Sequence, residues 1–224
     1  MTETVLVQTY AAPPVDRREI IRYMGARELT EELSVMLEEC LREVEGRLSY
    51  RICWRELPVS TDACGVELGT IKVPSASLAR NLECCHRAIL FGATVGLEMD
   101  RLIARYSRLQ PVKGLMFQAI GTERVEALCD AFCADLCREA AAEGKTLRPR
   151  FSPGYGDLPL ELQKDIFREL DCSRKIGLSL NGSLLMSPTK SVTAIVGIAD
   201  GPEENYRKEK CAGCGQPDCA FKRL

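Results

Sequence analysis

The sequence has little net charge and no long apolar segment. Its 224 residues include 30 Lys and Arg against 32 Asp and Glu, which leaves a net charge of −2 at pH 7. This balance provides no basic surface field, so we expect neither nucleic acid nor a membrane as a partner. No run approaches the ~18 apolar residues of a membrane span, and the N-terminus shows no apolar signal segment. These absences predict a soluble, cytoplasmic protein.

Histidine is nearly absent, because His86 is the only one in the chain. It follows Cys84 and Cys85, and two thiols beside an imidazole can indicate a metal site. Adjacent residues of a strand point to opposite sides, so at most two of these three side chains could reach one ion. A structural role is therefore the favoured interpretation, and a ligand role is the alternative.

The composition fits one domain with two terminal extensions. Apolar residues make up 46% of the chain and charged residues 28%, and the length allows one substantial core or two small ones. Residues 1–14 are predicted to form an extended arm that ends in two prolines. Residues 15–200 are expected to form the domain, and residues 201–224 a polar linker and a cysteine-rich tail.

Apolar periodicity predicts several helices, with Thr30 and Ser77 as N-caps and Gly144 as a C-terminal stop. The predicted helices are 16–25, 31–44, 78–84, 97–106, 112–142 and 160–170.

Strands are predicted on both sides of this helical region. The alternation over 48–55 is typical of a half-buried strand, and the continuous apolar run over 88–95 of a buried one. The other predicted strands are 67–73, 176–180, 183–186 and 192–198, with a hairpin turn at Asn181-Gly182. Strands at the beginning, middle and end predict a single α+β domain with a mixed or antiparallel twisted sheet and several helices.

The chain has 12 cysteines, and their spacing separates them into groups. Cys129, Cys133 and Cys137 recur every four residues on one apolar helical stripe. Free cysteine behaves as a small apolar side chain, so we expect these three to belong to the core.

The C-terminal cysteines have a different pattern. Cys211, Cys214 and Cys219 lie in a loop rich in Gly, Pro and Asp, where no helical stripe can form. The Cys-x-x-Cys spacing of the first pair is suited to zinc or to an iron–sulfur cluster. A distant cysteine, His86 or an exogenous group would complete the ligand set. The alternatives are a redox dithiol and a tail without a site.

The most informative segment is the ten-residue run from Arg150 to Pro159. Its two prolines and two glycines predict a rigid, non-helical loop that can approach a ligand closely. The Arg150 guanidinium can hold a carboxylate by two hydrogen bonds, and Tyr155 offers a ring face and a hydroxyl. This combination suits a small zwitterionic ligand; the alternative is a tight connection that precedes a helix.

The pattern Arg-x-Ser-Pro-Gly-Tyr-Gly-x-x-Pro, followed by a helix, resembles the activation domain of cobalamin-dependent methionine synthase. The stretches 91–103 and 190–197 resemble the same family, particularly its stand-alone members, and the resemblance covers about residues 15–200. It implies binding of S-adenosylmethionine and support of the reductive remethylation of oxidised cobalamin. In that reaction one electron and a methyl group from S-adenosylmethionine return the cofactor to its active cycle.

The resemblance also implies a set of ligand contacts. Matched residue by residue, they are Arg150, Ser152, Gly154 and Tyr155, with Arg150 on the ligand carboxylate. An upstream acidic residue would hold the ligand's ammonium group, and Asp130 is the best match. Glu126 is the alternative, and both could instead be solvated helix charges.

The chain also departs from that family. It contains no cobalamin-binding domain and no Asp-x-His-x-x-Gly motif, so any activity is expected to operate in trans on a cobalamin-binding methionine synthase or another corrinoid protein. The family's later aromatic residue has no secure counterpart, although Tyr206 is a candidate. A cysteine tail replaces the expected C-terminal segment. A flavodoxin- or ferredoxin-type reductant, or a cluster in the tail, could deliver the electron.

Three classes of function follow from these observations. The first is a module that binds S-adenosylmethionine and reactivates a corrinoid methyltransferase. The second is a metal- or iron–sulfur-carrying redox protein that docks on a corrinoid protein and keeps a vestigial ligand loop. The third is a non-catalytic partner that shields the corrinoid. Intact Arg150 and Tyr155 favour the first class.

Overall fold

The computed structural model describes residues 4–62 and 65–201. The cysteine tail and Tyr206 lie outside these residues. Within the described part of the chain, no helix is both long and apolar enough to cross a membrane.

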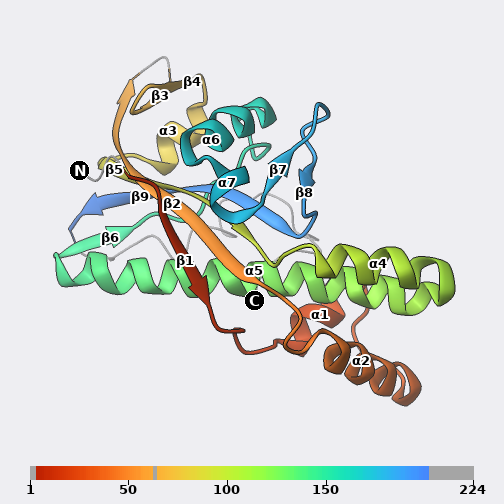
Figure 1. Cartoon of the computed structure of the whole chain (residues 1–224). Coiled ribbons are helices and arrows are strands. Elements are labelled where there is room, and N and C mark those ends of the chain that lie inside the picture. Colours follow the sequence, from red (N-terminus) through yellow and green to blue (C-terminus); the bar gives the residue numbers. More distant parts are fainter. Residues whose placement is uncertain (1–3, 63–64, 202–224) are drawn as a thin grey trace.

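A twisted antiparallel sheet forms the centre of the molecule, as Figure 1 shows. Its strand order is β4-β3-β2-β5-β9-β6, and β1 pairs with the first half of β2. The strands are β1 (Leu6–Tyr10), β2 (Tyr50–Asp62), β3 (Gly65–Leu68), β4 (Ile71–Val73), β5 (Cys85–Thr94), β6 (Lys145–Leu147) and β9 (Ser191–Asp200). A second sheet contains only β7 (Ser179–Leu180) and β8 (Met186–Ser187). The predicted α+β class with an antiparallel sheet is confirmed.

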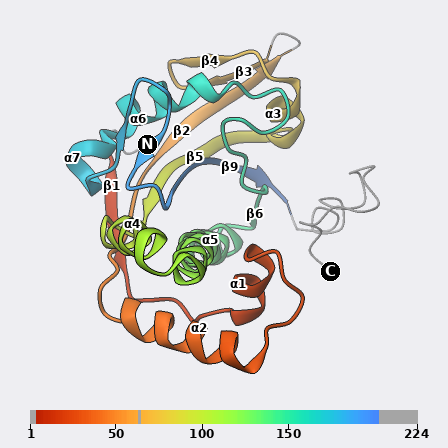
Figure 2. The ribbon, with the colours of Figure 1, turned by 90° about the vertical axis from the view of Figure 1, so that its right-hand side faces the viewer.

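Helices cover both faces of this sheet (Figure 2). On one face lie α1 (Arg17–Tyr23), α2 (Glu31–Val44), α4 (Glu98–Leu109) and α5 (Pro111–Ala142). On the other lie α3 (Ala76–Asn81), the short 3₁₀ helix η1 (Leu160–Leu162), α6 (Gln163–Leu170) and α7 (Cys172–Ile176). The apolar side chains therefore form two buried clusters, one on each side of the sheet. The first cluster lies under α1, α2, α4 and α5, and the second lies under the second layer of helices, α3, η1, α6 and α7.

The long helix α5 packs between the sheet and the α1–α2 pair. It is therefore buried on several sides, and even the charged side chains of Glu123 and Arg124 are inside. Cys129 is fully buried, as its apolar stripe predicts, whereas Cys133 and Cys137 are only half-buried. The core includes more of this helix than a single stripe, because both of its neighbours need apolar contacts.

Several element boundaries agree with local sequence signals. Helix α2 begins after Thr30, whose hydroxyl accepts a hydrogen bond from Leu33 N at 3.4 Å. Asp16 caps α1 in the same way, and Gly144 follows the end of α5 at φ +70°. A left-handed residue directly after a helix ends its hydrogen-bond ladder, and glycine adopts that conformation without steric cost.

Other predicted boundaries are wrong. The segment 67–73 is not one strand, because β3 and β4 form a hairpin that turns at Gly69 (φ +59°). Ser75, not Ser77, caps α3 and accepts from Leu78 N at 3.0 Å. Strand β2 is also longer than predicted, and Cys53, which the alternation assigned to the polar face, is fully buried against the helices of the second layer.

The strands and the turn predicted near residue 180 are also placed wrongly. Residue 176 ends helix α7, and the strand begins only at Ser179. Asn181-Gly182 does not form a two-residue hairpin turn. The Asn181 side chain accepts hydrogen bonds from Ser183 N and Leu185 N at 2.9 and 3.0 Å, and Leu184 has φ +62°. This side chain stabilises a wider loop than the dipeptide by itself indicates.

Candidate functional site

The segment from Arg150 to Pro159 lies along the edge of the central sheet. After β6, Arg148 N donates to Gly197 O at 2.8 Å, and Phe151 exchanges two 2.9 Å hydrogen bonds with Ile195. The segment therefore continues along β9. Because successive side chains in extended backbone point to opposite sides, Phe151 packs on the second cluster while Arg150 faces α5.

The rest of the segment is a compact loop with its own hydrogen bonds. Gly154 N donates to Leu158 O at 2.9 Å, and Tyr155 N donates to Ser152 O at 3.1 Å. Gly156 has φ +56°, and a Cβ at this position would lie 2.9 Å from Ser77 Oγ. Only glycine fits there without strain, so this part of the motif preserves the loop's shape.

Asp157 attaches the loop to helix α3. Its carboxylate accepts hydrogen bonds from Ser75 Oγ at 2.5 Å, Ala76 N at 2.8 Å and Ser77 N at 3.1 Å. These hydrogen bonds, that from Ser75 first, lower the pKa of Asp157 from 3.8 to about 2. The last part of the motif therefore has a structural role that the sequence pattern does not reveal.

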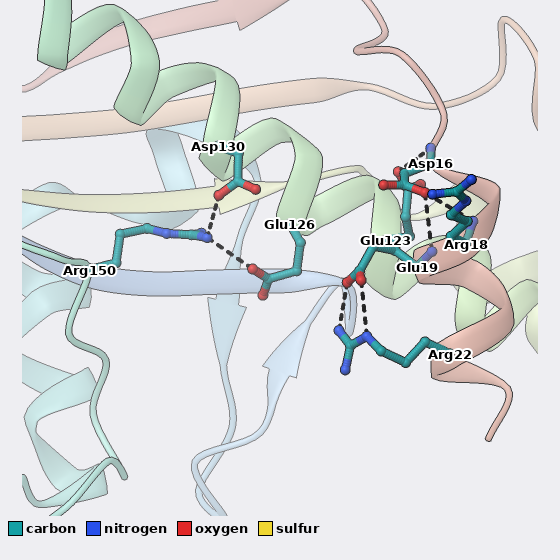
Figure 3. Close-up of polar contacts among 8 residues, drawn as sticks. All are labelled: Asp16, Arg18, Glu19, Arg22, Glu123, Glu126, Asp130 and Arg150. Carbon is teal, nitrogen blue, oxygen red and sulfur yellow. Dashed lines mark hydrogen bonds and ion pairs between the residues drawn. The ribbon is translucent and has the colours of Figure 1, made fainter. Parts of the chain in front are cut away.

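Arg150 meets two carboxylates of α5, as Figure 3 shows. Its Nη2 lies 2.6 Å from Asp130 Oδ1 and 3.1 Å from Glu126 Oε2. The two acidic residues are one turn apart on the helix, which places both on the side that faces the loop. The structure thus brings together Arg150 and both acidic candidates from the sequence.

The groups around Arg150 stabilise the positive charge of its guanidinium. Burial alone would lower the pKa of Arg150, but Cys129 and the carboxylates of Glu126 and Asp130 raise it above its ordinary value. Among the described residues, Nη2 is the only Arg150 atom that donates a hydrogen bond. The Arg150 side chain is 17% exposed.

A groove of about 300 Å³ lies beside this cluster, between α5, α1 and the N-terminal arm. Its lining has more carboxylates than cationic groups, although Glu19 pairs with Arg22, Glu123 with Arg124, and both Glu126 and Asp130 with Arg150. Its lining residues are Pro13, Pro14, Asp16, Glu19, Tyr23, Glu123, Glu126, Ala127, Asp130 and Ala131. Carboxylates and a tyrosine ring are the groups that attract cationic ligands in proteins.

Buried charges hold the arm against α5 and so form one wall of the groove. Arg124 donates to Pro13 O at 2.6 Å and to Pro14 O at 2.7 Å, and it pairs with Glu123 at 2.5 Å. Glu123 Oε1 also accepts from Asp16 N at 3.0 Å. These contacts hold the end of the arm, beyond β1, against α5.

The groove includes acidic residues that sequence reasoning did not select. No sequence motif includes Asp16, Glu19 or Glu123. The first two lie more than a hundred residues before Asp130 along the chain. The only available signal was the helix-cap pattern at Asp16, which points to local structure. Of the ligand residues implied by the family, Tyr155 is 61% exposed and edge-on to Phe151, while Ser152 and Gly154 lie in the loop.

No group of three or more His, Cys, Asp or Glu side chains suited to a metal occurs in residues 4–62 and 65–201. In the Cys84-Cys85-His86 run, Cys85 is buried, whereas Cys84 and His86 are exposed. The proposed ligands Cys211, Cys214 and Cys219 lie outside the described residues.

Comparison with known proteins identifies the fold. No protein-family model matches the chain, and no curated protein matches it. A crystal structure of the MetH reactivation domain bound to AdoHcy matches with a TM-score of 0.60 at 14% sequence identity. The match covers 91% of this chain and 80% of that chain. This likeness establishes a fold similar to that of the MetH reactivation domain.

Proposed function

We propose that this protein binds S-adenosylmethionine at Arg150 and the adjoining acidic groove, and that it supports the reductive methylation of a corrinoid protein in trans. The observation that carries the proposal is the convergence of Arg150 with Glu126 and Asp130 at the groove. The likeness to a reactivation domain bound to AdoHcy supports the same class of ligand.

The charges of the site suit both ends of that ligand. S-Adenosylmethionine carries a carboxylate, an ammonium group and a sulfonium group. Arg150 can take the carboxylate through Nε and Nη1, because Glu126 and Asp130 hold the guanidinium through Nη2. The surplus of carboxylates in the groove favours the two cationic groups. Ser152, Gly154 and Tyr155 would complete the ligand contacts from the loop.

The role of the chain in this reaction is positioning. A corrinoid on the partner protein, a methionine synthase or a related methyltransferase, would supply the cobalt nucleophile that accepts the methyl group. The residues of this chain would orient the sulfonium and exclude water. A flavodoxin- or ferredoxin-type protein would provide the electron.

Calorimetric titration with S-adenosylmethionine under anaerobic conditions tests the proposal. We expect saturable binding by the full chain and at least tenfold weaker binding by Arg150→Ala, a loss of about 1.4 kcal/mol or more. Arg168→Ala is the matched control, because Arg168 is exposed on α6 and pairs with Asp165 of the same helix. The control should bind as tightly as the unaltered protein. Absence of binding at millimolar ligand, or equal affinities for all three proteins, would contradict the proposal.

The cysteine tail favours a second candidate function. Three cysteines at 211, 214 and 219 have the spacing of a zinc or iron–sulfur site, and they would make this chain a redox or metal-carrying protein that docks on a corrinoid protein. In that case the loop at Arg150 would not bind a ligand, and the titration distinguishes the two functions.

A further inference from the structure

Two cysteines that the groove does not use face each other inside the second cluster. Cys53 lies on β2 and Cys172 is the first residue of α7, 119 positions away along the chain. Their Sγ atoms are 3.8 Å apart, and both side chains are fully buried. This separation is a contact between two free thiols.

The surroundings leave room for the two sulfurs to approach. Gly92 on the neighbouring strand β5 lies directly beside them. A Cβ at this position would be 3.2 Å from Cys172 Sγ and 3.6 Å from Cys53 Sγ. Any larger residue would fill this space, so the glycine permits the side-chain rotation that bond formation requires.

The helix that carries Cys172 is short. Helix α7 has five residues, and it is flanked by Asp171 (φ +49°) and Gly177 (φ +70°), both left-handed. Asp171 is strained in this conformation, because a non-glycine residue rarely adopts it. A short segment between two such residues is suited to local opening, which would admit a small oxidant to the buried thiols.

We propose that Cys53 and Cys172 form a reversible disulfide when a hydroperoxide oxidises the protein. The thiolate of one cysteine attacks a peroxide oxygen, the O–O bond breaks, and the cysteine becomes a sulfenic acid. The hydroxide that leaves takes up the proton lost by the thiol and becomes water. The second thiol displaces the hydroxyl group as a second water, and the S–S bond forms. The two thiols lose two electrons, which the peroxide gains. The bond would attach α7, and with it α6, to the central sheet.

Peptide mapping after treatment with hydrogen peroxide tests this site. We expect a cross-linked peptide pair that contains Cys53 and Cys172 and that disappears after reduction with dithiothreitol. The exposed thiol of Cys84 reports that the oxidant has acted. Because the closed loop is long, oxidation should raise the Tm by about 5–10 °C. If Cys84 is fully oxidised while Cys53 and Cys172 remain free thiols, the proposal is overturned.

Matched variants separate this cross-link from other oxidation. Cys53→Ser and Cys172→Ser should each lose the rise in Tm, whereas Cys40→Ser, which removes a buried thiol of the other cluster, should keep it. A rise that persists in both pair variants would also overturn the proposal. Where either variant fails to fold, the mapping of the unaltered chain decides.

Discussion

Two carboxylates in this protein accept hydrogen bonds from backbone N–H groups that lie far away in the sequence. Asp157 belongs to the ligand-type loop, yet its side chain satisfies the first N–H groups of α3. Glu123 is 3% exposed and accepts from the backbone of the arm at Asp16. Both are polar residues whose partners come from distant parts of the chain, and their substitution should therefore affect stability rather than only surface charge.

Replacing Asp157 with Asn should lower stability in a pH-dependent way. The folded-state pKa of Asp157 is about 2 and its ordinary value is 3.8, so its contribution is complete above the ordinary value and is lost as pH falls toward 2. We expect the Tm difference between the unaltered protein and Asp157→Asn to shrink between about pH 6 and about pH 2.5. Calorimetric melts across this range measure it. A Tm difference that stays constant over this pH range would refute the assignment.

Removing one member of the buried Glu123–Arg124 pair should be costly. Arg124→Met leaves the carboxylate buried and unpaired and also frees the carbonyls of Pro13 and Pro14. We expect a loss of about 3–5 kcal/mol in the free energy of unfolding, measured in urea. The double variant with Glu123→Gln should lose less than the sum of the two single variants, because no unpaired charge remains. Additive losses would show that the two groups act independently.

At the scale of elements, α4 and α5 form an antiparallel pair whose backbones come close together at Gly114. Gly114 of α5 lies against Ser107 of α4, and a Cβ at Gly114 would be 2.9 Å from the Ser107 Cα and N atoms. These are backbone atoms, which a rotamer change cannot move. The interhelical distance therefore depends on the absence of a side chain at this position.

Gly114→Ala tests this contact, because two effects oppose each other. Alanine gains about 1 kcal/mol of helix propensity over glycine. The clash with the α4 backbone should outweigh this gain, as overpacking costs about 1–3 kcal/mol. We expect net destabilisation in urea unfolding, while Gln118→Ala at an exposed position of α5 should change stability by less than about 0.5 kcal/mol. A stabilised Gly114→Ala variant would show that the helices separate without cost.

At the scale of the whole molecule, the groove exists only because three parts of the chain meet. The end of the arm, α1 and the middle of α5 line this groove, and the sheet edge places Arg150 against the carboxylates of Glu126 and Asp130 on α5. These contacts occur in a fold similar to that of the MetH reactivation domain.

The whole chain also includes the cysteine tail, for which we predict bound metal. Protein purified without oxygen should contain zinc or iron in an amount near one site per chain, measured by elemental analysis and, for a cluster, by its visible absorbance. Replacing Cys211, Cys214 and Cys219 together with Ser should abolish this content. The same change at Cys129, Cys133 and Cys137 removes three buried or half-buried thiols of α5 and should leave the metal content unchanged. The prediction would be refuted if the unaltered protein contained neither zinc nor iron.

Much of the local structure could be predicted from the sequence, because its signals are short in range. The Thr30 cap, the apolar period of α5 and the continuous apolar run of β5 each depend on neighbouring residues, and each is confirmed. Predicted boundaries of helices and strands were wrong where a residue from elsewhere in the fold competes with a local sequence signal. Asp157 binds the N–H of Ser77, so Ser75 takes the cap position, and the Asn181 side chain replaces the expected turn.

The sequence by itself predicted an α+β class with a mixed or antiparallel sheet and a rigid loop at Arg150, which follow from periodicity and turn chemistry. The family resemblance implied Asp130, or Glu126, as the residue that holds the ligand's ammonium group. Only the tertiary structure decided that both carboxylates contact Arg150, that Asp16 and Glu19 join them in one groove, and that Cys53 faces Cys172. The physical reason is that these contacts join residues many positions apart, which chain packing brings together and no local pattern encodes.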